Sequence, residues 1–125
     1  MNERRKILLV DDSSTTRMLE QMILRKGDYD VVCAADGAEA VVKAAQVQPD
    51  LILMDAMMPK MDGYEAVKRI REHEELRNTP IIMVTTRSEA ANVEKGFASG
   101  CTDYVTKPID ASELLAKIRN CLVRA

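Results

Sequence analysis

Acidic, hydroxyl and lysine side chains follow four of the short apolar segments in this sequence of 125 residues. Asp11 and Asp12 follow the first segment and Asp55 follows the third, while Thr85 and Lys107 follow the fourth and fifth. If the first and third segments form neighbouring strands, the three carboxylates lie close together and repel one another. Carboxylate oxygens without His or Cys ligands suit Mg²⁺, which would relieve that repulsion.

Together these groups could carry out phosphoryl transfer. An ionised carboxylate is already a nucleophile, so it can attack phosphorus and form an acyl phosphate without a general base. Mg²⁺ and Lys107 would neutralise charge on the equatorial phosphoryl oxygens, and Thr85 would donate a hydrogen bond to them. A single acidic residue after a strand could equally be a turn or a helix cap, so the prediction depends on the combination.

Five apolar segments are expected to form the strands that position these residues. The segments at residues 6–10, 51–54 and 81–84 are apolar almost throughout, as is typical of strands buried on both faces of a parallel sheet. Two further strands are expected at residues 29–34 and 103–106. In an open parallel sheet, function collects at the carboxyl ends of the strands, where the polar residues above are found.

Segments with helical spacing of apolar residues separate these strands. The first is expected to bury a stripe of Met18, Leu19, Met22 and Ile23, and the fourth covers residues 90–97. Five strands alternating with five helices predict a single α/β domain over residues 1–125, with a doubly wound, five-stranded parallel sheet.

The composition excludes several classes of protein. A net charge of −2 argues against a nucleic-acid binder held by phosphate contacts and against a polybasic membrane-surface protein. No apolar run approaches the length of a membrane span, so no membrane insertion is expected. The three cysteines lack metal-ligand spacing, which favours small buried side chains in a reducing compartment and predicts a cytoplasmic protein.

Five motifs in this order resemble the receiver domain of bacterial two-component response regulators, the CheY-like family. They are residues 7–13 (ILLVDDS), 51–55 (LILMD), 58–63 (MPKMDG), 82–85 (IMVT) and 104–108 (YVTKP). The resemblance extends from Lys6 to Leu122 and implies the strand order 2-1-3-4-5. It also implies a signalling phospho-acceptor, which catalyses only its own phosphorylation and dephosphorylation, rather than an enzyme acting on other substrates.

The resemblance assigns a role to each acidic residue. Asp55 would accept the phosphoryl group from a phosphohistidine on a sensor histidine kinase or phosphotransfer protein. Mg²⁺ would be held by Asp11, Asp12, Asp55 and the backbone carbonyl of Met57.

The resemblance also implies a switch. Thr85 and Lys107 would contact the phosphoryl group, and Tyr104 would swing inward as Thr85 moves. The bond between Lys107 and Pro108 would be cis. The surface formed by the fourth helix, fifth strand and fifth helix would then control an output partner or an attached output domain, in a monomer or a phosphorylation-dependent dimer.

Three positions near the acceptor are expected to tune the reaction. Thr86 stands where Ala or Gly is more usual in the family, and its bulk would narrow access to the phosphoryl group. Met57 and Arg87 occupy variable positions that, in the family, tune dephosphorylation.

Three alternative functions follow from the same residues. A Mg²⁺-dependent aspartyl phosphohydrolase usually carries a second Asp two residues after its nucleophile, where this sequence has Met57. A flavodoxin-like cofactor binder would place a flavin phosphate beside Asp11 and Asp12, which would repel it. A pseudo-receiver that does not accept phosphate would be expected to have lost one of Asp12, Asp55, Thr85 and Lys107. Whether the domain is a stand-alone regulator or part of a longer protein stays open.

Overall fold

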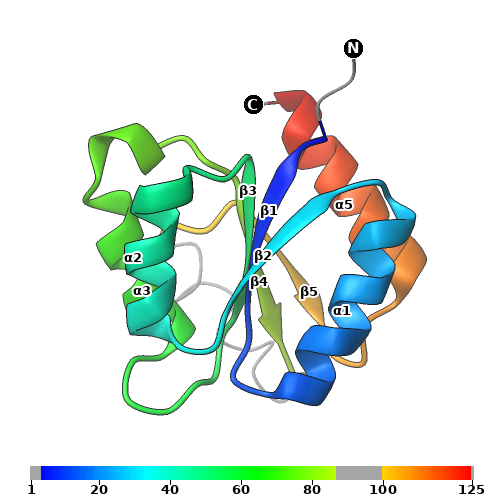
Figure 1. Ribbon diagram of the computed structural model, residues 1–125, viewed down its shortest axis with the longest axis horizontal. Helices are drawn as coiled ribbons and strands as arrows, with labels where there is room; N and C mark the ends of the chain where they lie inside the picture. Colours follow the sequence, from blue (N-terminus) through cyan, green and yellow to red (C-terminus); the bar gives the residue numbers. More distant parts are fainter. Residues whose placement is uncertain (1–3, 87–99, 125) are drawn as a thin grey trace.

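The computed structural model describes residues 4–86 and 100–124, in which strands and helices alternate along the chain (Figure 1). The elements are β1 (Lys6–Val10), α1 (Ser14–Lys26), β2 (Asp30–Ala34), α2 (Gly37–Val47), β3 (Leu51–Asp55), α3 (Gly63–Arg71), the 3-10 helix η1 (Glu74–Leu76), β4 (Ile81–Thr85), β5 (Asp103–Thr106) and α5 (Ala111–Arg124). The described part therefore holds four α-helices. The expected fourth helix, at residues 90–97, lies outside the described residues.

The five strands form one parallel sheet in the order β2-β1-β3-β4-β5. This confirms the expected five-stranded parallel sheet and its strand order. Helices α1 and α5 cover one face of the sheet, and α2 and α3 cover the other (Figure 1). The winding reverses between β1 and β3, so the carboxyl ends of these two strands meet at the switch point where ligands bind in such folds.

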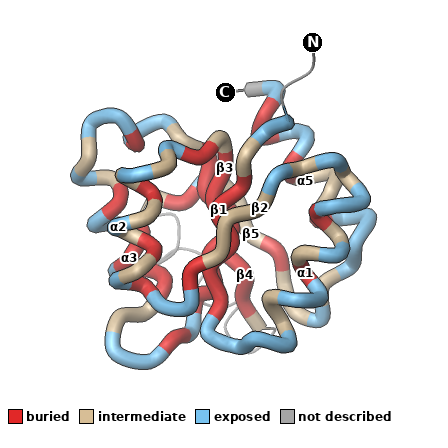
Figure 2. The backbone as a smooth tube through the Cα atoms, in the orientation of Figure 1, coloured by how far each residue is buried: buried red, intermediate tan, exposed pale blue. Residues whose placement is uncertain are grey.

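The apolar character of the central strands follows from burial on both faces. Every residue of β3 and β4 is buried, and so are four of the five residues of β1. Their side chains alternate between two cores, since Leu8 and Ile52 face α2 and α3 while Ile7 and Leu53 face α1 and α5. Figure 2 shows the buried residues concentrated in these strands, with the exposed residues mostly on the helices and loops around them.

Acidic caps begin three of the helices, at the Asp-x-x-Glu positions of the sequence. Asp36 accepts a hydrogen bond from the backbone N–H of Glu39, and Asp62 accepts one from the N–H of Glu65, at 2.8 and 2.9 Å. Asp110 likewise accepts a hydrogen bond from the backbone N–H of Glu113 at 3.1 Å. Each cap satisfies an N–H group that the first helical turn leaves unpaired.

Helix α1 turns a different face to the sheet from the one expected. Met18, Leu19 and Met22 are each more than half exposed, whereas Glu20 and Leu24 are buried. Ile23, the fourth member of the predicted apolar stripe, packs against the core, but the other three positions were wrong because the buried face of α1 carries Glu20 and Leu24 instead.

Two strand ends also differ from the expected boundaries by one residue. Asp55 and Thr85 are the last residues of β3 and β4 rather than the first loop residues, because each still pairs with a neighbouring strand. The acceptor candidate is consequently held by sheet backbone on its amino-terminal side. No helix in the described residues is both long enough and apolar enough to span a membrane.

Candidate functional site

Three carboxylates meet where β1 and β3 end side by side. Asp11 directly follows β1, Asp12 comes next, and Asp55 closes β3. Each offers an oxygen atom within 4.8 Å of the others. Asp11 and Asp55 are only 1% and 4% exposed, while Asp12 is open to solvent. The expected meeting of these three side chains is therefore confirmed.

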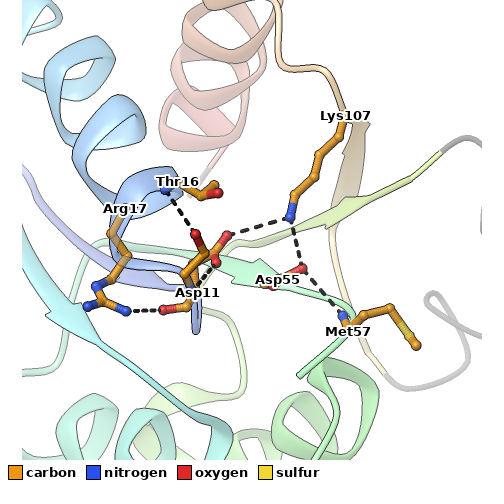
Figure 3. A network of polar contacts seen from close by, with 7 residues as sticks. Asp11, Thr16, Arg17, Asp55, Met57 and Lys107 are labelled. Atoms are coloured by element: carbon orange, nitrogen blue, oxygen red, sulfur yellow. Dashed lines mark hydrogen bonds and ion pairs between the residues drawn. The ribbon is translucent and has the colours of Figure 1, made fainter. Parts of the chain in front are cut away.

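Asp11 is held in place by its own loop and by α1. Its carboxylate Oδ1 accepts a hydrogen bond from the backbone N–H of Ser13 at 2.8 Å. Its backbone carbonyl accepts one from Nη1 of Arg17 at 2.6 Å, as Figure 3 shows. The buried Oδ2 atom accepts no hydrogen bond from any described residue. One carboxylate oxygen of Asp11 therefore points into the cluster.

Lys107, which follows the edge strand β5, extends its side chain toward the same cluster (Figure 3). Its Nζ atom lies 3.5 Å from Oδ1 of Asp55 and 3.6 Å from Oδ2 of Asp11. The residue donates its backbone N–H to the carbonyl of Thr85 at 2.6 Å and precedes Pro108 through a cis peptide bond. The cis bond agrees with the expectation from the resemblance.

Burial and charge together set the proton affinities of this cluster. Burial, together with the charge of Asp11, raises the pKa of Asp55 to about 6, although Lys107 and the backbone N–H of Met57 act in the opposite direction. Burial alone would lower the pKa of Lys107, but the charges of Asp55 and Asp11 outweigh it and the net pKa is raised. Lys107 is therefore an ammonium ion at neutral pH.

Thr85 and Tyr104 lie on the neighbouring strands. Thr85 is 4% exposed at the end of β4, and its Oγ1 atom has no hydrogen-bond partner among the described residues. Tyr104 is partly buried against the core under α2 and α3, opposite Met83 on β4. The ammonium of Lys117 lies 4.9 Å from the centre of the Tyr104 ring. These strands therefore bring the two expected switch residues close to each other along the sheet.

Met57 combines a fixed backbone with an exposed side chain. Its N–H donates to Oδ1 of Asp55 at 3.3 Å, while its side chain is 60% exposed (Figure 3). Thr86, the residue after β4, is partly buried, and Arg87 lies outside the described residues. Of the two positions expected to tune dephosphorylation, Met57 thus contacts the acceptor through its backbone.

The donor set fits a hard divalent cation. The clustered ligands are carboxylates, and a buried oxygen of Asp11 is without a hydrogen bond. Oxygen ligands of this kind, with one side open to solvent through Asp12, match the preference of Mg²⁺ for a few carboxylates and several waters. The residues present are therefore suited to Mg²⁺.

Two residues near the cluster were missed by the sequence analysis. Gly63 begins α3 and donates its N–H to the carbonyl of Ala56 at 2.9 Å, and a Cβ atom here would lie 2.2 Å from the backbone oxygen of Asp55. Its place in the motif at residues 58–63 was the available signal. Glu20, on the buried face of α1, is 2% exposed. Its spacing of four residues from Leu24 could have indicated that burial.

The pKa of Glu20 connects it with the same cluster. Burial, with the charge of Asp11, raises this pKa to about 8, and the charge of Lys107 acts in the opposite direction. Glu20 is therefore a fourth carboxyl group that interacts electrostatically with the cluster.

Comparison with known proteins identifies relatives of the whole fold. Residues 7–119 match the family model described as the response regulator receiver domain. The chain is 40% identical over 119 residues to the DNA-binding dual master transcriptional regulator RpaA of Synechocystis, covering 95% of this chain and 49% of that protein. It is 36% identical over 114 residues to protein PilG of Pseudomonas aeruginosa, covering 91% of this chain and 84% of PilG.

One solved structure adds a metal to this comparison. It is the receiver domain of the sensor histidine kinase PA1611 from Pseudomonas aeruginosa, with a magnesium ion coordinated in the active-site cleft. It matches with a TM-score of 0.90 and 34% identity, over 97% of this chain and 99% of that one. The chain spans about half the length of the first curated relatives that it matches.

Proposed function

The chain belongs to the response regulator receiver domain family, and from that membership we propose that Asp55 accepts a phosphoryl group in phosphorylation-dependent signalling. One observation carries the assignment to this residue. The carboxylate of Asp55 is nearly buried, lies 3.5 Å from the ammonium of Lys107, and shares a cluster with two other carboxylates. The proposed donor is a phosphohistidine on a sensor histidine kinase or a phosphotransfer protein.

The proposed reaction is a single in-line displacement. An oxygen of the Asp55 carboxylate forms a bond to phosphorus, while the bond from phosphorus to the donor imidazole nitrogen breaks and that nitrogen keeps the electron pair. The Lys107 ammonium approaches the negative phosphoryl oxygens, and the hydroxyl of Thr85 donates a hydrogen bond to one of them. An ionised carboxylate holds no proton that must be removed, so the reaction needs no general base.

Asp11, Asp12 and Asp55, with the backbone carbonyl of Met57, would hold Mg²⁺. When bound, this ion supplies positive charge that offsets the negative charge of the incoming phosphoryl oxygens and of the carboxylates themselves. Support comes from the chemistry of the donor set and from the magnesium ion in the PA1611 relative.

Signal output is proposed to pass through Thr85 and Tyr104. Movement of the Thr85 hydroxyl toward the phosphoryl group would leave space for the Tyr104 ring and change the surface formed by β5, α5 and the fourth helix. A few kcal/mol of bias between two arrangements is enough to switch such a surface. The output partner or attached output domain would read this change, in a monomer or a phosphorylation-dependent dimer.

The domain itself is proposed to contact no nucleic acid directly and to act in the cytoplasm. The net charge of −2 supports the first statement. The second is supported by the three cysteines of the sequence, Cys33, Cys101 and Cys121, whose spacing gives no metal-ligand pattern and which suit a reducing compartment.

The phosphohydrolase alternative is not favoured. It calls for a second carboxylate two residues beyond the nucleophile, to protonate the leaving group. Met57 occupies that position and offers only a thioether.

Intact-mass analysis tests the proposal. Native protein incubated with phosphoramidate and Mg²⁺ is expected to gain the mass of one phosphoryl group, and Asp55→Asn is expected to gain none. Omitting Mg²⁺ should largely prevent the gain in the native chain. A full gain in Asp55→Asn would contradict the assignment.

A further inference from the structure

Glu20 is a buried carboxyl group that the proposed reaction does not use. It lies on the inner face of α1 and is 2% exposed. Its Oε2 atom has no hydrogen-bond partner among the described residues. A buried carboxyl oxygen without a donor is costly, so it is expected to have a partner in some state of the molecule.

Glu20 and Lys107 line the same groove. This groove, with a volume of about 450 Å³, lies between α1 and the segment that follows β5, and Leu19 and Ile109 supply part of its apolar wall. The two groups are close enough to interact across it, since the Lys107 ammonium lowers the pKa of Glu20 and a Glu20 carboxylate raises the pKa of Lys107. A flexible lysine side chain can therefore turn toward Glu20 through open space.

Lys107 needs a new partner when the carboxylate cluster holds a cation. Its Nζ atom stands 3.5 and 3.6 Å from oxygens of Asp55 and Asp11. A divalent cation bound to these carboxylates neutralises them and repels the nearby ammonium. The four-carbon side chain of lysine allows its charged end to move by several ångströms.

We propose that Glu20 is a positioning residue for Lys107, and that its carboxylate receives the Lys107 ammonium when a divalent cation occupies the carboxylate cluster. The inference rests on the proposed function, because it concerns the same metal and the same lysine. Lys26 also lines the groove but lies in the last turn of α1, whereas Lys107 already contacts the cluster. In the metal-free chain Lys107 pairs with Asp11 and Asp55, and Glu20 becomes its partner as the cation binds.

A double-mutant cycle measured by Mg²⁺ titration calorimetry tests this role. Glu20→Gln keeps the shape of the side chain but cannot become a carboxylate, and it is expected to weaken Mg²⁺ binding about fivefold or more. In a Lys107→Gln background there is no ammonium to reposition, so most of that loss should disappear. Glu20→Asp, which restores the charge on a shorter chain, should recover part of the affinity.

Two controls separate positioning from general effects. Glu72→Gln removes an exposed carboxylate at the C-terminal end of α3, and it is expected to leave Mg²⁺ affinity within about twofold. Glu20→Leu, which fills the same space without a polar group, should fold stably and show the same loss as Glu20→Gln. Thermal unfolding of each metal-free variant identifies any loss caused by misfolding.

The outcomes distinguish the positioning role from the proposed function. Unchanged affinity in Glu20→Gln overturns the role of Glu20, and so does an equal loss with and without Lys107, which would indicate a direct effect on the cation. The function would stand in either case. If the native protein binds no Mg²⁺ and gains no phosphoryl group from phosphoramidate, both proposals are overturned.

Discussion

Asp55 illustrates how a residue can be reactive and destabilising for the same reason. It is nearly buried, it faces Asp11, and its pKa is raised to about 6 from an ordinary value of 3.8. Burial removes the water that would stabilise its charge, and the neighbouring carboxylate adds repulsion. Lys107 compensates in part through a contact of 3.5 Å. The metal-free site is therefore under electrostatic strain that a bound cation would relieve.

This strain predicts a pH-dependent effect of Asp55→Asn on stability. Between about pH 4 and pH 6 the folded chain binds a proton that the unfolded chain releases, so this carboxyl makes folding less favourable as the pH rises through that window. Above pH 6 the full penalty applies. In EDTA at pH 8, Asp55→Asn is expected to be more stable than the native chain by about 1–3 kcal/mol. Urea unfolding at pH 8 and at pH 4.5 measures the difference, which should shrink at the lower pH. An equal difference at both values would contradict this explanation.

A second prediction at this scale concerns Met57. Its exposed side chain stands two residues after the acceptor, and its backbone N–H contacts Asp55. An amide side chain at this position could orient a water molecule toward the acyl phosphate. Met57→Asn is therefore expected to change the lifetime of the phosphorylated protein severalfold, as followed by the decay of its intact mass. Met57→Leu, which stays apolar, serves as the control, and identical decay in all three proteins would rule out this role.

At the scale of elements, the packing of α3 against the end of β3 depends on Gly63. A Cβ atom at this position would lie 2.2 Å from the carbonyl oxygen of Asp55 and 2.9 Å from the Cα of Ala56. Both neighbours are backbone atoms at the acceptor itself. The helix can therefore approach the strand this closely only without a side chain at its first residue.

Gly63→Ala is accordingly expected to destabilise the fold by about 2–4 kcal/mol, since backbone must move to admit the methyl group. Gly27→Ala is the matched control. Its Cβ atom would meet side-chain atoms of Tyr29 and Leu115 at 2.8–2.9 Å, which can move more easily. Urea unfolding should show a clearly smaller loss for Gly27→Ala. Equal losses would mean that close backbone contact does not explain Gly63.

The elements also show where sequence patterns were sufficient and where they were not. Apolar runs predicted β1, β3 and β4, because strands buried on both faces have no polar side. The edge strands β2 and β5 were also predicted, although they are only partly buried and each begins with an aspartate. The buried stripe of α1 was predicted wrongly at three of its four positions, since Met18, Leu19 and Met22 are exposed while Ile23 packs against the core. Its rotation follows from contacts with the sheet and with α5, which the spacing of apolar residues within one helix does not contain.

The candidate site shows a similar division. The meeting of Asp11, Asp12 and Asp55 followed from their places at strand ends in a parallel sheet. The roles of Glu20 and Gly63 did not, because both depend on distances between elements. Burial of a glutamate beside the cluster required the rotation of α1, and the close approach at Gly63 required the position of α3.

At the scale of the whole molecule, a bound cation should stabilise the fold. Mg²⁺ that binds the folded chain alone contributes about 1.4 kcal/mol at tenfold excess over its dissociation constant. Thermal unfolding is expected to shift upward with millimolar Mg²⁺, and Asp12→Ala should lose most of that shift while its metal-free form stays at least as stable as the native protein. A strongly destabilised Asp12→Ala would show instead that this exposed carboxylate has a structural role.

The most direct test of the central claim identifies the phosphorylated residue itself. Borohydride reduces an acyl phosphate of aspartate to homoserine, releasing the phosphate, and peptide mass spectrometry then locates the changed residue. After treatment with phosphoramidate and Mg²⁺, homoserine is expected at position 55 and nowhere else. Homoserine at position 11 or 12, or at no position despite a folded protein and bound Mg²⁺, would contradict the account.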